Sequence, residues 1–174
     1  MKKFDTKSIV LTALFSALVL LATMVIKIPS LNGYVNIGDT MILVCAIILG
    51  RKHAMLAGAI GSALADILLG YAMYAPFTFV IKGLEGFIAG MLFYQMTKHN
   101  ILPAWSRVVA AVIPAALWMW AGYFICNNIL FGLAAAMSSA VGDGFQAGAS
   151  IIFGVVLVSA LSKANIAARI AVNH

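Results

Sequence analysis

Residues 65–86 read ADILLGYAMYAPFTFVIKGLEG, a stretch that sets an acid, a lysine and a second acid into apolar sequence around a short aromatic turn. A side chain that stays ionised inside hydrocarbon costs roughly 3 kcal/mol or more, so charged residues in apolar spans are candidates for a functional site. The three charges are Asp66, Lys82 and Glu85. We expect the rest of the chain to build a site around them.

The composition sets the class of protein. The chain has 174 residues, of which 64% are hydrophobic and 9% charged, and its mean hydropathy is +1.07. About a quarter of the residues of a soluble domain are charged. The sequence therefore predicts an all-α integral membrane protein with membrane lipid around it. Its net charge of +6 is interpreted as a signal of topology and not of a nucleic-acid partner.

Apolar runs of about the length that a bilayer requires predict a single domain over residues 1–174, a bundle of six transmembrane helices. The expected helices cover about residues 8–27, 37–51, 54–70, 77–97, 103–126 and 143–162. Residues 28–40 contain a proline, two glycines and Asn36, which favour a loop, and its length is typical of a functional loop or a lid. Residues 129–142 are small and weakly apolar, and we expect them to connect the last two helices.

The basic residues orient the bundle, because cytoplasmic loops are enriched in Lys and Arg. With six helices, nine of the eleven Lys and Arg residues fall on one side, which places both termini in the cytoplasm. Lys27 and Lys82 are the exceptions, and a count of five helices would break the pattern. The nine are Lys2, Lys3, Lys7, Arg51, Lys52, Lys98, Arg107, Lys163 and Arg169. We expect a multi-pass protein of the plasma membrane with residues 28–40 outside.

This topology brings the polar residues to one depth near the outer surface, where four of the five acids lie. Small-molecule pockets have mostly apolar or aromatic walls and a few polar groups that orient the ligand. Aromatic residues at a similar depth would supply the walls here, and the polar residues would orient the ligand. These aromatic residues are Tyr71, Tyr74, Trp118, Trp120 and Tyr123. The candidate substrate-binding residues are Asn36, Asp66, Tyr74, Lys82, Glu85, Trp118, Asn127, Asn128, Asp143 and Gln146.

The order of these motifs resembles the substrate-binding S components of energy-coupling factor (ECF) vitamin transporters, over roughly residues 5–165. The resemblance rests on Ala13-x-x-x-Ala17, Asn36-Ile37-Gly38-Asp39, Leu49-Gly50, Ala65 to Tyr71, and Ile81-Lys82-Gly83-Leu84-Glu85-Gly86. The Lys-Gly-Leu-Glu-Gly stretch is most similar to the subgroup linked to hydroxymethylpyrimidine or pyridoxine uptake.

The resemblance implies a subunit that captures a vitamin from outside under a lid and docks onto a membrane scaffold subunit with two ATPase subunits. It also implies that Ala13 and Ala17 form the docking surface, although packing inside the bundle explains small residues at this spacing too. The chain has no Gly-x-x-x-x-Gly-Lys-Ser/Thr motif, so ATP hydrolysis is expected on the partners.

Each candidate has a structural alternative. Lys82 and Glu85, three apart on one helix, can pair with each other instead of touching ligand, and Asp66 can pair with Lys82. Asp39 and Asp143 stand at expected first helical turns, where a carboxylate caps free N–H groups; capping is favoured for Asp39 and left open for Asp143. Cys45 and Cys126 are expected to be buried thiols.

An intramembrane enzyme is disfavoured, because His53, His99 and His174 all fall on the cytoplasmic side, away from the acids. No metal site and no cofactor is expected. An ion or proton channel that uses the buried acids, and an S component for thiamine, riboflavin or pantothenate, remain alternatives. The excess of acids favours a neutral or cationic heteroaromatic ligand, stacked on Trp118 or Tyr74 with a nitrogen held by Glu85.

Overall fold

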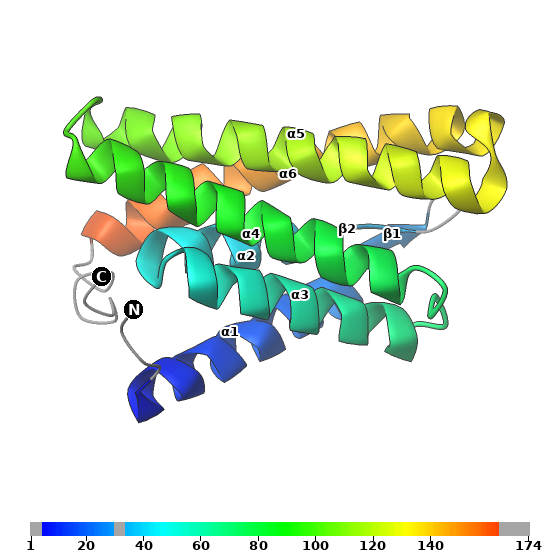
Figure 1. Ribbon diagram of the computed structural model, residues 1–174, viewed down its shortest axis with the longest axis horizontal. Coiled ribbons are helices and arrows are strands. Elements are labelled where there is room, and N and C mark those ends of the chain that lie inside the picture. Colours follow the sequence, from blue (N-terminus) through cyan, green and yellow to red (C-terminus); the bar gives the residue numbers. More distant parts are fainter. Residues whose placement is uncertain (1–4, 30–33, 164–174) are drawn as a thin grey trace.

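The computed structural model describes residues 5–29 and 34–163. Lys2, Lys3, Arg169, His174 and residues 30–33 of the predicted lid lie outside the described part. Long helices run side by side along the molecule, with α1 inclined across them and a small β-hairpin at one end (Figure 1). The elements are α1 (Thr6–Val25), β1 (Lys27–Pro29), β2 (Tyr34–Asn36), α2 (Gly38–Ile48), α3 (Arg51–Leu68), α4 (Ala75–Lys98), α5 (Ala104–Phe131) and α6 (Leu133–Lys163).

Four of the helices, α1, α4, α5 and α6, are long and apolar enough to cross a membrane. Their outward faces carry large apolar side chains, such as Val25, Phe145 and Val156, which are more than half exposed. Exposing such apolar side chains to water is unfavourable, whereas lipid tails are as apolar as they are. A surface of this kind therefore favours contact with lipid. The chain is therefore a multi-pass membrane protein.

The short helix α2 forms the centre of the bundle. It has 11 residues and packs against α1, α3, α4 and α6. Ile42, Leu43 and Cys45 are completely buried within it. A helix of this length extends only roughly 16 Å, about half of a hydrocarbon core. The helix expected at 37–51 is thus a buried half-length element.

The most extensive helix contact is between α3 and α4, and glycine makes their close approach possible. A Cβ atom placed on Gly86 would lie 2.5 Å from the carbonyl oxygen of Ala54. Small residues let helix backbones approach to this degree, as in other membrane bundles. This contact holds the end of α3, which carries Asp66, beside the start of α4, which carries Thr78.

Two segments differ from the sequence prediction. The expected loop 28–40 contains a short antiparallel hairpin in which Lys27 pairs with Asn36 and Pro29 with Tyr34. The expected connection 129–142 is almost entirely helical: α5 continues to Phe131, and α6 begins at Leu133 after Gly132 turns the chain with a φ of +85°. Alanines after Gly132 favour helix. Asp143 therefore lies inside α6 and does not cap its first turn.

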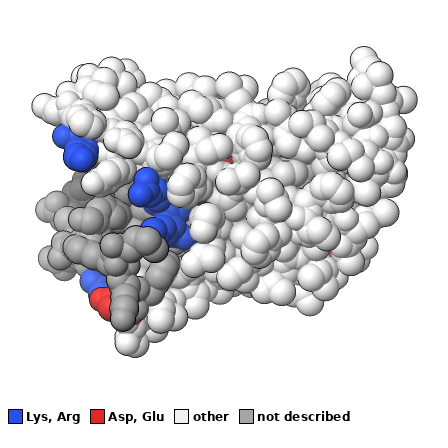
Figure 2. All heavy atoms as spheres, in the orientation of Figure 1, with Lys and Arg blue, Asp and Glu red and all other residues white. Residues whose placement is uncertain are grey.

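Basic residues gather at one end of the molecule, where α1, α3 and α5 begin and α4 ends. Lys7, Arg51, Lys52, Lys98 and Arg107 belong to these helix ends. On the face shown in Figure 2 the blue side chains lie at this end, and the rest of the described surface is almost free of charge. The hairpin lies at the opposite end. Cys45 and Cys126 are buried and unpaired, as predicted.

Candidate functional site

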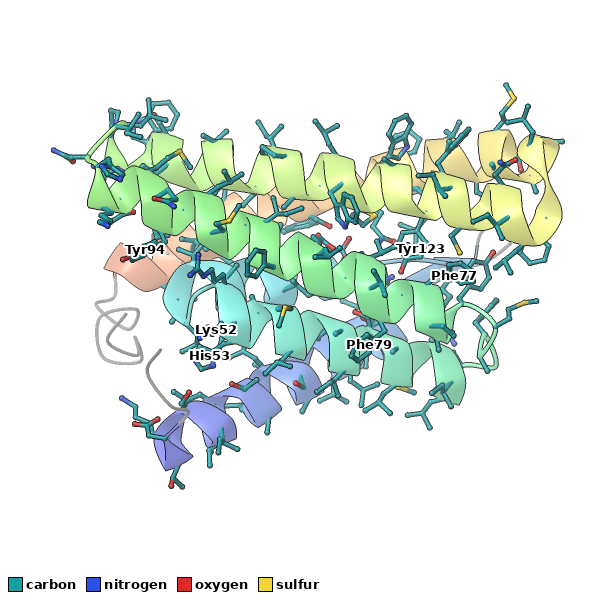
Figure 3. The ribbon with its side chains drawn as sticks, viewed as in Figure 1. Lys52, His53, Phe77, Phe79, Tyr94 and Tyr123 are labelled. Carbon is teal, nitrogen blue, oxygen red and sulfur yellow. The ribbon has the colours of Figure 1, made fainter. Side chains whose placement is uncertain are left out.

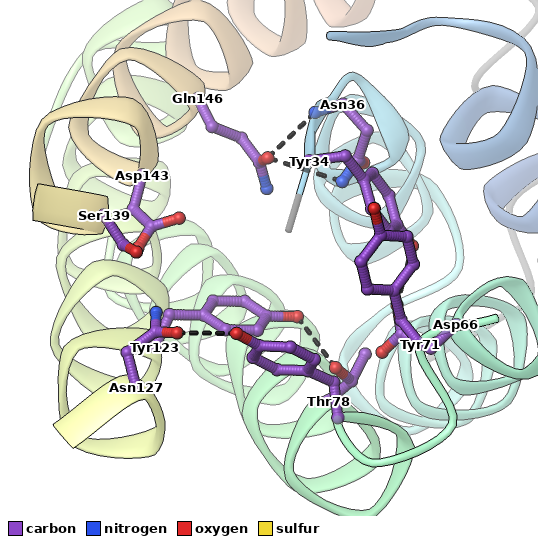
Figure 4. A pocket seen from close by; sticks show the side chains of 11 residues that line it. Tyr34, Asn36, Asp66, Tyr71, Thr78, Tyr123, Asn127, Ser139, Asp143 and Gln146 are labelled. Atoms are coloured by element: carbon purple, nitrogen blue, oxygen red, sulfur yellow. Dashed lines mark hydrogen bonds between the residues drawn. The ribbon is translucent and has the colours of Figure 1, made fainter. Parts of the chain in front are cut away.

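A polar pocket opens at the hairpin end of the bundle. It contains about 510 Å³ of empty space, part of it open to solvent. The hairpin and helices α3 to α6 all contribute to its walls (Figure 4). The lining residues are Tyr34, Asn36, Asp66, Tyr71, Tyr74, Thr78, Tyr123, Asn127, Ser139, Asp143 and Gln146. Four tyrosines together with acids and amides suit a planar, polar ligand.

Tyrosines form two sides of the pocket. The rings of Tyr34 and Tyr71 lie 5.2 Å apart between centroids, on the side of the hairpin. On the other side the hydroxyl of Tyr74 donates to Oδ1 of Asn127 at 2.7 Å, and Tyr123 lies 3.1 Å from the hydroxyl of Thr78. Because these hydroxyls are hydrogen-bonded, the rings are held in place before a ligand arrives.

Two carboxylates face the pocket from opposite walls. Asp66, on α3, accepts a hydrogen bond from the Tyr34 hydroxyl on Oδ1 at 2.6 Å, while its buried Oδ2 receives none from the described residues. Asp143, on α6, likewise has a buried Oδ2 without a partner in the described part of the chain. Buried polar atoms are normally hydrogen-bonded, so two open acceptors in one pocket indicate places for ligand donors.

Tyr34 connects the hairpin to this acid. Burial and the neighbouring Asp66 raise the pKa of Tyr34 far above its ordinary value. The phenol therefore keeps its proton and donates to Asp66 over the whole physiological pH range.

A second connection joins the hairpin to α6. The backbone N–H of Asn36 donates to Oε1 of Gln146 at 2.9 Å, and Nε2 of Gln146 donates to Oδ2 of Asp39, also at 2.9 Å. Asn36 and Gln146 both line the pocket. One amide thus links the lining to a charged group buried beneath it.

That buried group consists of Asp39, Lys82 and Glu85. Lys82 Nζ is paired with Asp39 and lies 3.3 Å from Oε2 of Glu85. The three side chains are at most 2% exposed. The role favoured for Asp39 from the sequence, helix capping, is wrong in this respect: its oxygens accept from Lys82 and Gln146. Lys82 is held away from the pocket by the two acids.

The ten predicted binding residues fall into two sets. Six line the pocket, namely Asn36, Asp66, Tyr74, Asn127, Asp143 and Gln146. Lys82 and Glu85 lie in the buried group, Trp118 donates its indole N–H to the carbonyl of Ile81 at 3.1 Å, and Asn128 is exposed. A ring stacked on Trp118 and a nitrogen held by Glu85 are therefore not what the pocket lining offers.

Some lining residues were not among the predicted binding residues. Tyr71 and Tyr123 were expected only as aromatics at this depth, and Tyr34, Thr78 and Ser139 were not singled out. Helical spacing carries the missing signal, since Ser139, Asp143 and Gln146 follow one another at intervals of four and three residues on one face of α6. The assumed break at 129–142 hid this face.

The opposite end of the bundle has a different character. His53 on α3 lies 2.7 Å from the hydroxyl of Thr12 and 3.3 Å from that of Ser8, both on α1. Figure 3 shows Lys52, His53 and Tyr94 at this end, far from Tyr123 and Phe77. Among the described residues, no three His, Cys, Asp or Glu side chains are grouped so as to hold a metal ion.

Comparison with known proteins identifies the family. The family model described as ECF-type riboflavin transporter, S component, matches residues 3–163. The chain belongs to this family of ECF transporter S components. S components are the substrate-binding subunits of vitamin transporters and are not enzymes, so the expected class of function is confirmed.

Two relatives accompany this match. The S component described here is 36% identical, over 79% of its length and 88% of the relative's, to an uncharacterized protein in the gap 3' region of Pyrococcus woesei. It is 26% identical, over 93% of its length and 91% of the relative's, to the thiamine precursor transporter HmpT of Lactococcus lactis subsp. cremoris MG1363.

Proposed function

We propose that this S component captures a neutral or cationic heteroaromatic vitamin or vitamin precursor, hydroxymethylpyrimidine or pyridoxine, from outside the cell. The family membership supports the general role, and the similarity to a thiamine precursor transporter over most of both chains supports the choice of ligand. The protein is proposed to cross the plasma membrane with both termini inside and the hairpin outside, as the basic residues at the opposite end favour.

The observation that carries the ligand choice is the charge of the pocket. Its described lining includes two aspartates and no Lys, Arg or His. Lys82, a cation buried beneath the lining, is engaged by Asp39 and Glu85. A carboxylate ligand would have to lie beside two aspartates in a partly buried pocket, with no cation among the described lining residues to balance its charge, which is unfavourable by roughly several kcal/mol. Ligands that bring donors, such as hydroxyl, amine or protonated ring nitrogen, match the lining.

The hairpin is proposed to act as the lid. Tyr34 and Asn36 line the pocket and are tied to α3 and α6 through Asp66 and Gln146. In this proposal a bound ligand leaves when these two hydrogen bonds break and the hairpin moves aside. This arrangement supports slow release and therefore high affinity, since differences in affinity between related complexes arise mostly in dissociation.

Energy for transport is proposed to come from a scaffold subunit carrying two ATPases. The docking surface assigned to α1 is available, because Ala13 and Ala17 are both exposed. Phe15 and Val19 point the other way, into the bundle. Exposure of the small residues favours an external partner over packing within the protein's own bundle.

Native mass spectrometry of the purified protein, followed by calorimetry, tests the ligand. We expect hydroxymethylpyrimidine or pyridoxine to bind with a Kd below about 1 µM. This Kd corresponds to a binding free energy of roughly −8 kcal/mol. Biotin and pantothenate serve as carboxylate comparators, and riboflavin and thiamine as other vitamins. Tight binding of a carboxylate vitamin would refute the charge argument and leave the transporter assignment intact.

A further inference from the structure

The pocket holds two acceptors that differ in how much hydrogen bonding they already receive. Asp66 is 5% exposed, its Oδ1 accepts from Tyr34, and its Oδ2 receives no hydrogen bond from the described residues. Asp143 receives no hydrogen bond from any described residue, and its Oδ2 is buried. Figure 4 shows the two side chains on opposite sides of the pocket, with tyrosines and Gln146 around the space between them.

The surroundings make the two carboxylates suited to different donors. The Tyr34 hydroxyl already neutralises part of the charge of Asp66, and one open oxygen suits one further neutral O–H donor. Asp143 has no such partner among the described residues, so its charge is better balanced by a cationic or strongly polarised N–H group. Lys82 is not available to Asp143, because the buried acids hold it.

We propose that Asp66 and Asp143 form a two-point recognition site for an amino-substituted heteroaromatic alcohol, with Asp143 accepting from the amine and Asp66 from the hydroxyl. This inference rests on the proposed function and narrows it. Hydroxymethylpyrimidine carries both groups, whereas pyridoxine carries hydroxyls without an amine. The aminopyrimidine is therefore the preferred ligand of the pair.

The same geometry couples recognition to the hairpin. The carboxylate that receives the ligand hydroxyl on Oδ2 is also the one that Tyr34 holds on Oδ1. A ligand bound at Asp66 fixes the orientation of that carboxylate, and so keeps Oδ1 in position to accept the hydrogen bond that ties the hairpin to α3. The hydroxyl is expected to affect the dissociation rate more than the amine does.

The test pairs each substitution with the removal of one ligand group. The probes are hydroxymethylpyrimidine, its analogue with hydrogen in place of the amine, and its analogue with hydrogen in place of the hydroxyl. Asp143→Asn is expected to weaken the parent ligand by about tenfold or more and the analogue without amine by less than about twofold. Asp66→Asn is likewise expected to weaken the parent ligand by about tenfold or more, and the analogue without hydroxyl by less than about twofold.

Asp5→Asn is the matched control. Asp5 caps α1 by accepting from the N–H of Ser8 at 2.8 Å, at the end of the molecule away from the pocket, and Asn caps about as well. This variant is expected to bind all three probes as the wild type does. Retained binding of the analogue that lacks the matched group also shows that an aspartate variant is folded.

The outcomes separate the two proposals. If each aspartate variant weakens all three probes by the same factor, the acids act through the fold or the general field, and the two-point site is refuted while the ligand assignment stands. If the wild type binds pyridoxine but none of the three probes, the aminopyrimidine preference is wrong. If it binds riboflavin but neither pyridoxine nor any of the three probes, the proposed choice of hydroxymethylpyrimidine or pyridoxine is wrong as well.

Discussion

At the scale of single residues, the buried group of Asp39, Lys82 and Glu85 is expected to stabilise the bundle more than it contributes to binding. Lys82→Met would leave two buried acids without their cation, and removing one partner of a buried ion pair costs about 3–5 kcal/mol. We expect a strongly lowered melting temperature in detergent. Lys52→Met, the same change at a partly exposed site, is the control; equal melting temperatures for the two variants would contradict this role.

The hydroxyl of Tyr34 is the residue-scale test of hairpin closure. Tyr34→Phe keeps the ring beside Tyr71 and removes the hydrogen bond to Asp66. Hydrogen bonds to charged groups contribute about 1.5–3 kcal/mol, so the ligand should dissociate roughly tenfold faster or more. Stopped-flow displacement measures this rate. A dissociation rate equal to that of the wild type would show that this hydrogen bond does not hold the pocket closed.

At the scale of elements, the contact of α3 with α4 depends on the absence of a side chain at Gly86. A methyl group there would lie 2.5 Å from the Ala54 carbonyl oxygen, so Gly86→Ala is expected to push the helices apart and to lower the melting temperature. Gly148→Ala on α6 is the matched control, because a Cβ there meets nothing within 4 Å. Alanine at 148 should be neutral or stabilising by up to about 1 kcal/mol; a loss at both positions would point to a general intolerance of α-helical glycine changes.

The sequence predicts an element well where the length of an apolar run determines it. It predicts an element less well where short strands or a single turn residue determine it. The helices α1, α4 and much of α5 follow from long apolar runs. The hairpin was missed because three-residue strands, Lys27–Pro29 and Tyr34–Asn36, carry no periodic signal. The start of α6 was missed because Gly132 was taken with its neighbours as a long break, although a single turn residue at a φ of +85° suffices.

The same distinction applies to the candidate site. The six predicted residues that line the pocket lie in the loops between the expected helices or near the ends of those helices, and the alternating direction of the helices predicts that these segments share one level of the bundle. Depth does not fix the direction in which a side chain points. Lys82 and Glu85 share the depth of the pocket but turn into the centre, where Asp39 on α2 meets them. Only the packing of α2 against α4 decides this.

At the scale of the whole molecule, the charge distribution predicts which end faces the cytoplasm. Met73 lies in the turn before α4, and His99 directly follows the other end of that helix. Both residues are exposed. After replacement of Cys45 and Cys126, a cysteine at position 73 should react with an impermeant thiol reagent in intact cells, and one at 99 only after permeabilisation. Labelling of position 99 alone in intact cells would reverse the proposed orientation.

The exposed small face of α1 gives the whole-molecule test of how this subunit is used. Ala13 and Ala17 lie outside the bundle, so Ala13→Trp or Ala17→Trp should fold and bind ligand normally. Close approach of a second helix depends on small residues, and an indole at either position would prevent it. We therefore expect uptake into cells to be lost while calorimetry of the isolated protein is unchanged. Ala121→Trp, at an exposed alanine of α5, is the control and should transport normally. If the α1 variants lose ligand binding as well, this face supports the fold of the subunit itself, and the partner must dock elsewhere.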